Sequence, residues 1–212
     1  MSTLIQKLHP ALYPGRRLSL AGSRRPLFSW QGMWDSGSAL HCAAMALAML
    51  GKLSDPVNVR AYANGPVAHF WVRAWPHYLH GLTPSELAGF VWELNAGVQP
   101  VEVEGSADEI LDFCSQELAT GWPVIVWIAN RRTGERHAAL AVGLEERDTI
   151  PKALLLLDPA GTTPVLAACN ARLESRKPHA WYITAEATVQ ADVDGAVSIR
   201  RLEDGASGAG CA

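Results

Sequence analysis

The sequence predicts an α+β domain in which a helical amino-terminal lobe precedes an antiparallel β-sheet. Two observations lead to this prediction. The first half contains helix-forming runs that begin with capping residues and stop at glycine, and the second half contains short apolar or β-branched runs between polar turns. With 212 residues, 49% of them hydrophobic, the chain is long enough for one domain with its own core.

Three helices are predicted in the first half. Residues 39–50 are a dense run of Ala, Leu and Met, all good helix formers, which ends at a glycine. Residues 83–97 open with the capping box Thr-Pro-Ser-Glu and continue with an apolar stripe. Residues 106–121 open with a second capping box and also stop at glycine, so both of these helices have defined ends.

The second half predicts strands. The apolar or β-branched runs are 123–128, 138–144, 153–157 and 180–188. Two further runs, 189–193 and 196–200, flank Asp194-Gly195, a dipeptide typical of two-residue hairpin turns. The pattern therefore predicts an antiparallel sheet that ends in a hairpin.

The two ends of the chain are expected to lie outside this domain. Residues 1–27 are interrupted by Pro and Gly and predict an irregular segment, residues 28–204 form the domain, and the Gly- and Ala-rich residues 205–212 predict a disordered tail. There is no secretory signal and no apolar stretch long enough to span a membrane, so we expect a cytoplasmic protein. Secretion by a machine that reads a disordered amino terminus is left open. The four cysteines, which we expect to be reduced, are Cys42, Cys114, Cys169 and Cys211.

Composition and spacing argue against several partners. A formal net charge of −3 gives no general attraction to phosphate backbones, so no nucleic-acid partner is expected. The chain has no Gly-rich phosphate loop between a strand and a helix. His77 and His80, with His69 nearby, have no Cys or carboxylate close in sequence, so we expect no metal and no cofactor.

Three segments together suggest covalent catalysis. Cys42 lies near the start of the first helix, where the helix dipole favours a thiolate. His137 opens a strand and can act as the base, and Asp158 ends the next strand and can orient the imidazole. Gln31 lies upstream of the helix and can donate to an oxyanion. These four residues are the predicted catalytic set.

The same segments resemble a known family, the papain-like cysteine peptidases of bacteria. The resemblance is to the bacteriocin-leader-processing peptidases and the papain-like effectors of plant pathogens. It covers residues 28–188 and is carried by Gln31, Met45, Leu50-Gly51, Gly121-Trp-Pro-Val, His137, Gly143 and Asp158-Pro159. It implies a papain-like architecture, with a cleft between the helical lobe and the sheet. It also implies thiol-dependent hydrolysis of a peptide or isopeptide bond in a peptide or protein substrate.

The sequence departs from this family at the nucleophile. The usual string is Asp-Cys-Gly, whereas this chain reads Asp35-Ser36-Gly37, and Cys42 lies eleven positions beyond Gln31. In one interpretation Cys42 is the nucleophile after a longer loop. In the other, Ser36 or Ser38 occupies the nucleophile position, and the protein is a catalytically inactive, peptidase-like binding module. The sequence leaves both interpretations open.

Overall fold

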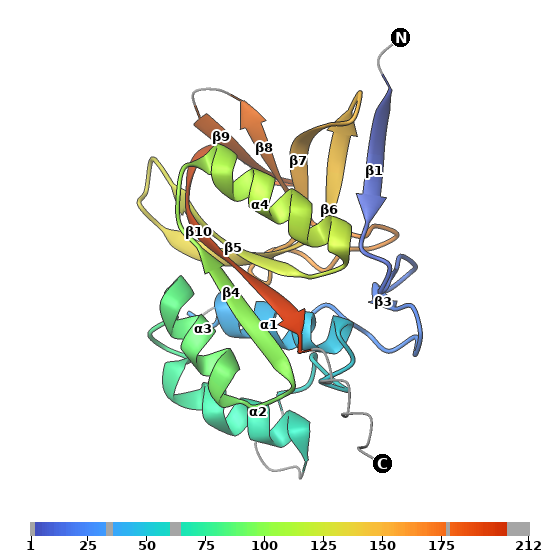
Figure 1. The fold of residues 1–212 in the computed structure, drawn as a ribbon, viewed down its shortest axis with the longest axis vertical. Helices are drawn as coiled ribbons and strands as arrows, with labels where there is room; N and C mark the ends of the chain where they lie inside the picture. Colours follow the sequence, from blue (N-terminus) through green and yellow to red (C-terminus); the bar gives the residue numbers. More distant parts are fainter. Residues whose placement is uncertain (1–2, 33–35, 60–64, 177–178, 203–212) are drawn as a thin grey trace, which may run out of the picture.

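The computed structural model describes residues 3–32, 36–59, 65–176 and 179–202, and the fold is mostly β (Figure 1). The strands are β1 (Leu4–Leu8), β2 (Leu12–Tyr13), β3 (Ser19–Leu20), β4 (Val98–Val103), β5 (Val124–Asn130), β6 (Arg136–Arg147), β7 (Ile150–Leu157), β8 (Ala171–Arg176), β9 (His179–Thr184) and β10 (Thr188–Arg201). The helices are α1 (Ser38–Met49), α2 (Pro66–Ala74), α3 (Pro84–Glu93) and α4 (Ala107–Thr120), with a short 3₁₀ turn, η1 (Trp75–His77).

Six antiparallel strands form a closed barrel. From β5 to β10 each strand pairs with the next one in the sequence, and β10 returns to pair with β5. Two strands add to this barrel from outside, because β1 pairs with β6 and β4 pairs with β10. Strands β2 and β3 form a separate two-stranded hairpin.

Strands β5 and β6 are buried on both faces, which explains their unbroken apolar sequences. Along β5, Ile125 and Trp127 belong to a core shared with α1, α2 and α3. The alternate residues Val124, Val126 and Ile128 belong to a second core shared with α4 and the barrel. These two strands therefore separate two hydrophobic cores.

The helices cover the sheet in different places. Helix α1 is buried at all twelve of its positions, so its small Ala side chains let it lie deep against β6 and β5. Helix α3 packs against β4 and β10, and α4 lies across the barrel against β10 and β7 (Figure 1). The predicted capping boxes are confirmed at Thr83 and Ser106, each of which accepts the backbone N–H of a glutamate three residues later.

The predicted α+β, papain-like fold class is wrong. The described chain is predominantly β, with a closed barrel and four short helices, and it has no amino-terminal helical lobe placed before a sheet. Strand β1 lies in the sheet before any helix begins, and α4 follows β4. Local patterns predicted α1, α3 and α4 and strands such as β5, β6 and β7, but they carry no information about the pairing of β10 with β5 that closes the barrel.

Two local predictions also differ from the structure. The segment 1–27, expected to be irregular, contains β1 and the β2–β3 hairpin. The expected hairpin at Asp194-Gly195 is absent, since β10 runs through it from Thr188 to Arg201 with a bulge against β5. A Cβ at Gly195 would lie 3.2 Å from the carbonyl oxygen of Val103, so glycine permits close packing there rather than a turn. The expected disordered tail, 205–212, lies outside the described residues.

Candidate functional site

The start of α1 is attached to β6 through a single residue of that strand, Ala138. The Ser38 hydroxyl oxygen accepts the backbone N–H of Ala138 at 3.0 Å, and the Cys42 thiol donates to the carbonyl oxygen of Ala138 at 3.6 Å. Ser38 and Cys42 are four residues apart and so share one face of the helix. The backbone N–H and C=O of Ala138 point away from β5, toward a side on which β6 has no strand partner at this residue. The side chains of Ser38 and Cys42 supply the hydrogen bonds that a neighbouring strand would otherwise make.

Cys42 is enclosed completely. Its side chain has no exposed surface, and burial together with the nearby charge of Asp158 raises the pKa of the thiol well above its usual value. The position also gives little help from the helix dipole, because Cys42 is the fifth residue of α1. The thiol is therefore protonated at neutral pH and acts as a hydrogen-bond donor to the sheet.

His137 and Asp158 lie together at the ends of neighbouring strands. Nε2 of His137 lies 3.7 Å from Oδ2 of Asp158, too long for a hydrogen bond but close enough for an ion pair with a protonated imidazole. The side chain of His137 is 26% exposed and that of Asp158 is 8% exposed. The structure thus brings His137 and Asp158 together, and Gln31 lies close to them as described below, although the catalytic roles of these residues stay predictions.

Asp158 is held by groups that the sequence analysis did not single out. The Tyr182 hydroxyl donates to Oδ2 at 2.5 Å, and the backbone N–H of Ala160 donates to Oδ1 at 2.9 Å. The side-chain oxygen of Asn170 accepts a hydrogen bond from the backbone N–H of Asp158, and its side-chain NH₂ donates to the backbone carbonyl oxygen of Asp158. Oδ2, the carboxylate oxygen nearest to His137, thus accepts a hydrogen bond from Tyr182.

Tyr182 also contacts the histidine directly. Its ring lies edge-on to His137 with centroids 5.1 Å apart. Burial and the charge of Asp158 raise the pKa of Tyr182, so its hydroxyl stays protonated and keeps donating. Tyr182 lies on β9, and nothing in the local sequence distinguishes it from an ordinary aromatic strand residue.

A cavity of about 770 Å³ lies beside these residues. Gln31, Ser36, Ser38 and His137 line it together, and Gln31 is fixed next to Asp158 because its backbone N–H donates to the carbonyl oxygen of Pro159 at 2.9 Å. Residues 80–86, which lead into the start of α3, also line it, and Glu104, Trp127, Glu135, Arg136, Ala138 and Asp194 complete the lining. Cys42 does not line this cavity, so Ser38 is the hydroxyl or thiol of α1 that faces it.

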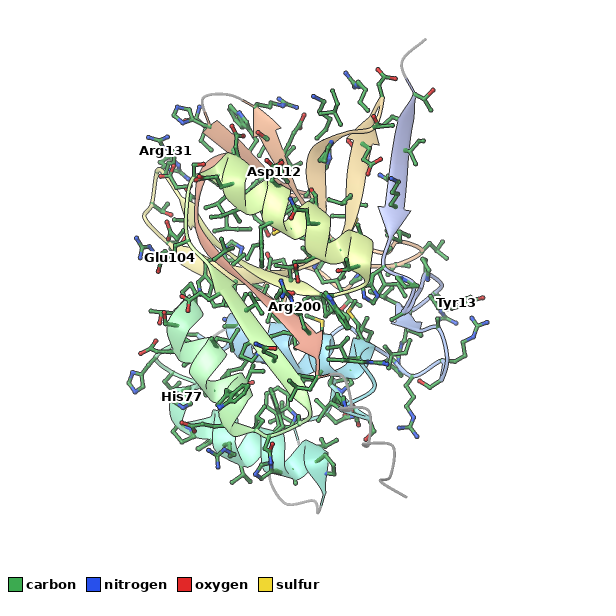
Figure 2. All side chains as sticks on the ribbon, viewed as in Figure 1. Tyr13, His77, Glu104, Asp112, Arg131 and Arg200 are labelled. Carbon is green, nitrogen blue, oxygen red and sulfur yellow. The ribbon has the colours of Figure 1, made fainter. Side chains whose placement is uncertain are left out.

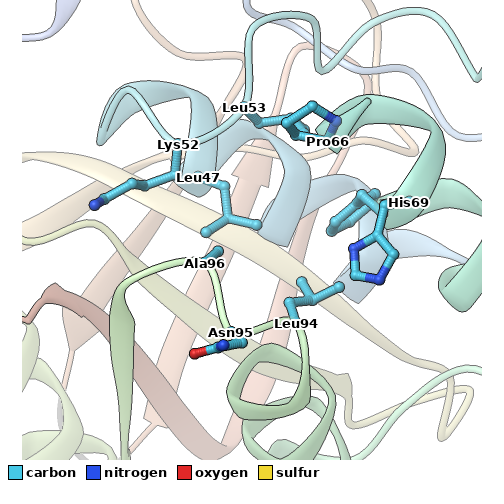
Figure 3. A pocket seen from close by; sticks show the side chains of 9 residues that line it. Leu47, Lys52, Leu53, Pro66, His69, Leu94, Asn95 and Ala96 are labelled. Atoms are coloured by element: carbon cyan, nitrogen blue, oxygen red, sulfur yellow. The ribbon is translucent and has the colours of Figure 1, made fainter. Parts of the chain in front are cut away.

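The three histidines considered for a metal site lie in different surroundings. His77 packs edge-on against Phe90, and His80 lines the cavity above. His69 lines a separate pocket of about 480 Å³ with mainly apolar neighbours such as Leu47 and Leu94 (Figure 3). Among the residues that the structure describes, no group of three His, Cys, Asp or Glu side chains could hold a metal ion.

Comparisons with known proteins leave the family unassigned. No family model matches the chain, and no curated protein matches it. One similar solved structure is that of EndoMS in its apo form, at 16% identity with a TM-score of 0.23. The match covers 50% of this chain and 55% of that one, so this chain spans about half the length of EndoMS. At this TM-score the likeness supports no inference about fold or activity.

In the described residues, no helix is long and apolar enough to cross a membrane.

Proposed function

We propose that this protein is a binding module that holds a segment of a polypeptide in the 770 Å³ cavity without cutting it. One observation carries the proposal. The thiol that would have to attack is buried against the carbonyl oxygen of Ala138, whereas a serine, Ser38, faces the cavity beside His137.

Chemistry at this site favours binding over cleavage. A thiol with a raised pKa supplies almost no thiolate, which is the form that attacks a carbonyl carbon. The Ser38 hydroxyl is a weaker nucleophile and already accepts the N–H of Ala138. The imidazole of His137 lies 3.7 Å from the carboxylate of Asp158, so it lacks the close hydrogen bond that would orient it.

The lining of the cavity suits the backbone of a peptide. Its volume falls in the usual range of about 300–1,000 Å³ for ligand sites. The walls carry amide, hydroxyl and imidazole groups from separate segments, including Gln31, Ser36, Thr83 and Ser85. Such groups can pair with the N–H and C=O groups that every peptide presents.

The proposal predicts that Cys42 is unreactive in the folded protein. Iodoacetamide at about pH 6 should label Cys42 only after unfolding, because the folded thiol is enclosed and protonated.

The proposal also predicts that the protein binds peptides of an array of random sequences and does not shorten them. Binding should fall at least about tenfold in Ser36→Trp, which fills the cavity mouth, because a bulky ring removes most of the contact area there. Ala185→Trp, in the exposed turn between β9 and β10, should bind normally and serves as the matched control.

A second candidate function is thiol-dependent hydrolysis of a peptide or isopeptide bond. The observation that favours it is the proximity of His137 to Asp158 at 3.7 Å. Labelling of Cys42 in the folded protein faster than in an unfolded control, lost in His137→Ala, together with shortened peptides, would support hydrolysis and reject the binding module. Intact peptides that bind equally to wild type and Ser36→Trp would reject the cavity as the site.

A further inference from the structure

A further cavity, also of about 480 Å³, lies on the β2–β3 hairpin and shares no lining residue with the first site or with the pocket that His69 lines. It is lined by Arg16, Arg17 and Arg24, with Ser19 and Pro26. All three arginines are exposed, while the hairpin that carries them is anchored by the pairing of Leu12 with Leu20 and by a bridge between Ser19 and Pro26. Three guanidinium groups therefore surround one concave surface on a defined scaffold.

The charges of this region are strongly segregated from the rest of the chain. The first thirty residues contain five Lys or Arg and no Asp or Glu, leaving 13 basic against 21 acidic residues in the remainder. The overall charge of −3 hides this separation. A basic end on an acidic protein is typical of chains that meet an anionic partner.

Among the residues that the structure describes, no acidic side chain neutralises the three arginines. None of the ion pairs formed among the described residues includes Arg16, Arg17 or Arg24. By contrast Lys7, on the adjacent β1, pairs with Glu146 at 2.7 Å. Arg24 lies over the ring of Tyr13, 3.2 Å from its centroid, which fixes its position and leaves the guanidinium charge uncompensated. An anionic ligand would relieve the mutual repulsion of these groups.

An exposed apolar tip lies next to the arginines. Val165 and Leu166, in the loop between β7 and β8, are 63% and 78% exposed. The backbone N–H of Leu166 donates to the carbonyl oxygen of Gly15 at 2.9 Å, so the loop rests on the hairpin. Leu166 has a φ of 56°, an unfavourable backbone conformation for leucine, and yet its side chain contributes nothing to the core. Figure 2 shows Tyr13, which marks this face, projecting from the edge of the molecule opposite to Arg131.

We propose that this face binds the surface of an anionic phospholipid bilayer. The three arginines would take phosphate groups of the lipid heads, and Val165 and Leu166 would enter the interface between the heads and the acyl chains. A nucleic acid or a soluble phosphate would satisfy the arginines equally well, but it offers nothing to the two apolar side chains. The combination of cationic pocket and apolar tip therefore favours a lipid surface.

Co-sedimentation with vesicles tests the proposal. The full chain should bind vesicles of phosphatidylcholine mixed with phosphatidylserine, bind phosphatidylcholine alone weakly, and dissociate as salt is raised. Arg16→Gln combined with Arg17→Gln should weaken binding about 25-fold, at roughly fivefold per charge near an anionic surface. Leu166→Ser should weaken it about tenfold by removing one buried leucine from the interface.

Arg131→Gln combined with Arg132→Gln removes the same charge from a loop on the other side of the molecule and is the matched control. The proposal requires this control to bind like wild type, and equal losses in the two double variants would show that only net charge matters. Binding of inorganic phosphate or of a single-stranded oligonucleotide without binding to vesicles would also overturn it. So would capture by poly-glutamate but not by lipid, which would indicate an acidic protein partner.

Discussion

One buried polar residue, His9, connects the amino-terminal segment to the end of α4. His9 is only 6% exposed, and both of its ring nitrogens are used. Nε2 donates to the carbonyl oxygen of Gly121 at 2.9 Å, and Nδ1 accepts the backbone N–H of Ala11 at 3.1 Å. The neutral imidazole satisfies both contacts, whereas a proton on Nδ1 removes the second one.

His9 should therefore make stability depend on pH. Burial lowers the pKa of His9 below its usual 6.5, so the unfolded chain takes up a proton before the folded one does. The stabilisation from the neutral ring is complete above pH 6.5 and is lost as the pH falls toward the lowered folded pKa. The contribution of His9 to the slope of the free energy of unfolding against pH is at most about 1.4 kcal/mol per pH unit.

Urea unfolding at a series of pH values checks this prediction. His9→Gln should flatten the dependence below pH 6.5 by the contribution of one titrating group. His80→Gln, at an exposed position, should retain the wild-type slope. An unchanged slope in His9→Gln would mean that the acid sensitivity originates elsewhere.

At the same scale, the sequence identified some of the site residues and could not place others. The order of motifs singled out Gln31, His137 and Asp158, and the structure places these three near one another. Whether Cys42 or a serine faces the cavity depends on where the helix begins. Helix ends are the least certain part of a sequence pattern, and α1 begins at Ser38, one turn before Cys42.

At the scale of elements, α4 is joined to β10 by a charged cluster. Glu117 is buried and receives two hydrogen bonds of 2.7 Å from the guanidinium of Arg200 and one of 2.6 Å from the Ser198 hydroxyl. Such a bidentate pair fixes both distance and orientation between a helix and a strand. Its partners lie more than eighty residues apart, so no local sequence pattern predicts it.

Removing the charge of Glu117 should weaken the attachment of α4 to β10 and so destabilise the protein. Glu117→Gln leaves Arg200 without its carboxylate, and we expect the free energy of unfolding to fall by about 2 kcal/mol, less than for a fully buried pair because Arg200 is partly exposed. Thermal and urea unfolding measure the change. Glu93→Gln breaks the exposed pair with Arg73 and should cost at most about 0.5 kcal/mol. Similar losses in both variants would contradict the special role of the buried pair.

At the scale of the whole molecule, close approach of backbones decides how β1 joins the barrel. Leu8 of β1 pairs with Gly143 of β6, and a Cβ at Gly143 would lie 2.6 Å from the carbonyl oxygen of Lys7. Backbone atoms cannot move away from such a contact without moving the strand. Gly143 is therefore required for β1 to lie where it does.

Gly143→Ala should displace β1 from the sheet. We expect a loss of about 1–3 kcal/mol in the free energy of unfolding from overpacking. The amide of His9, which donates to the carbonyl oxygen of Val142, should exchange with solvent faster. Gly89→Ala, at an exposed position of α3 with nothing within 4 Å of the added Cβ, should instead stabilise the protein by about 0.5–1 kcal/mol. Normal exchange at His9 in Gly143→Ala would show that β1 accommodates the methyl group.

The sequence by itself determined the local elements with strong signals. Capping boxes and glycine stops located α3 and α4, and unbroken apolar runs located strands such as β5 and β7, because these signals act within a few residues of the element they define. Only the tertiary structure decided that β10 closes a barrel with β5 and that β1 joins the sheet. It also placed Cys42 behind Ala138 while Ser38 faces the cavity. Those outcomes depend on contacts between residues far apart in the chain, whose energies no short window of sequence contains.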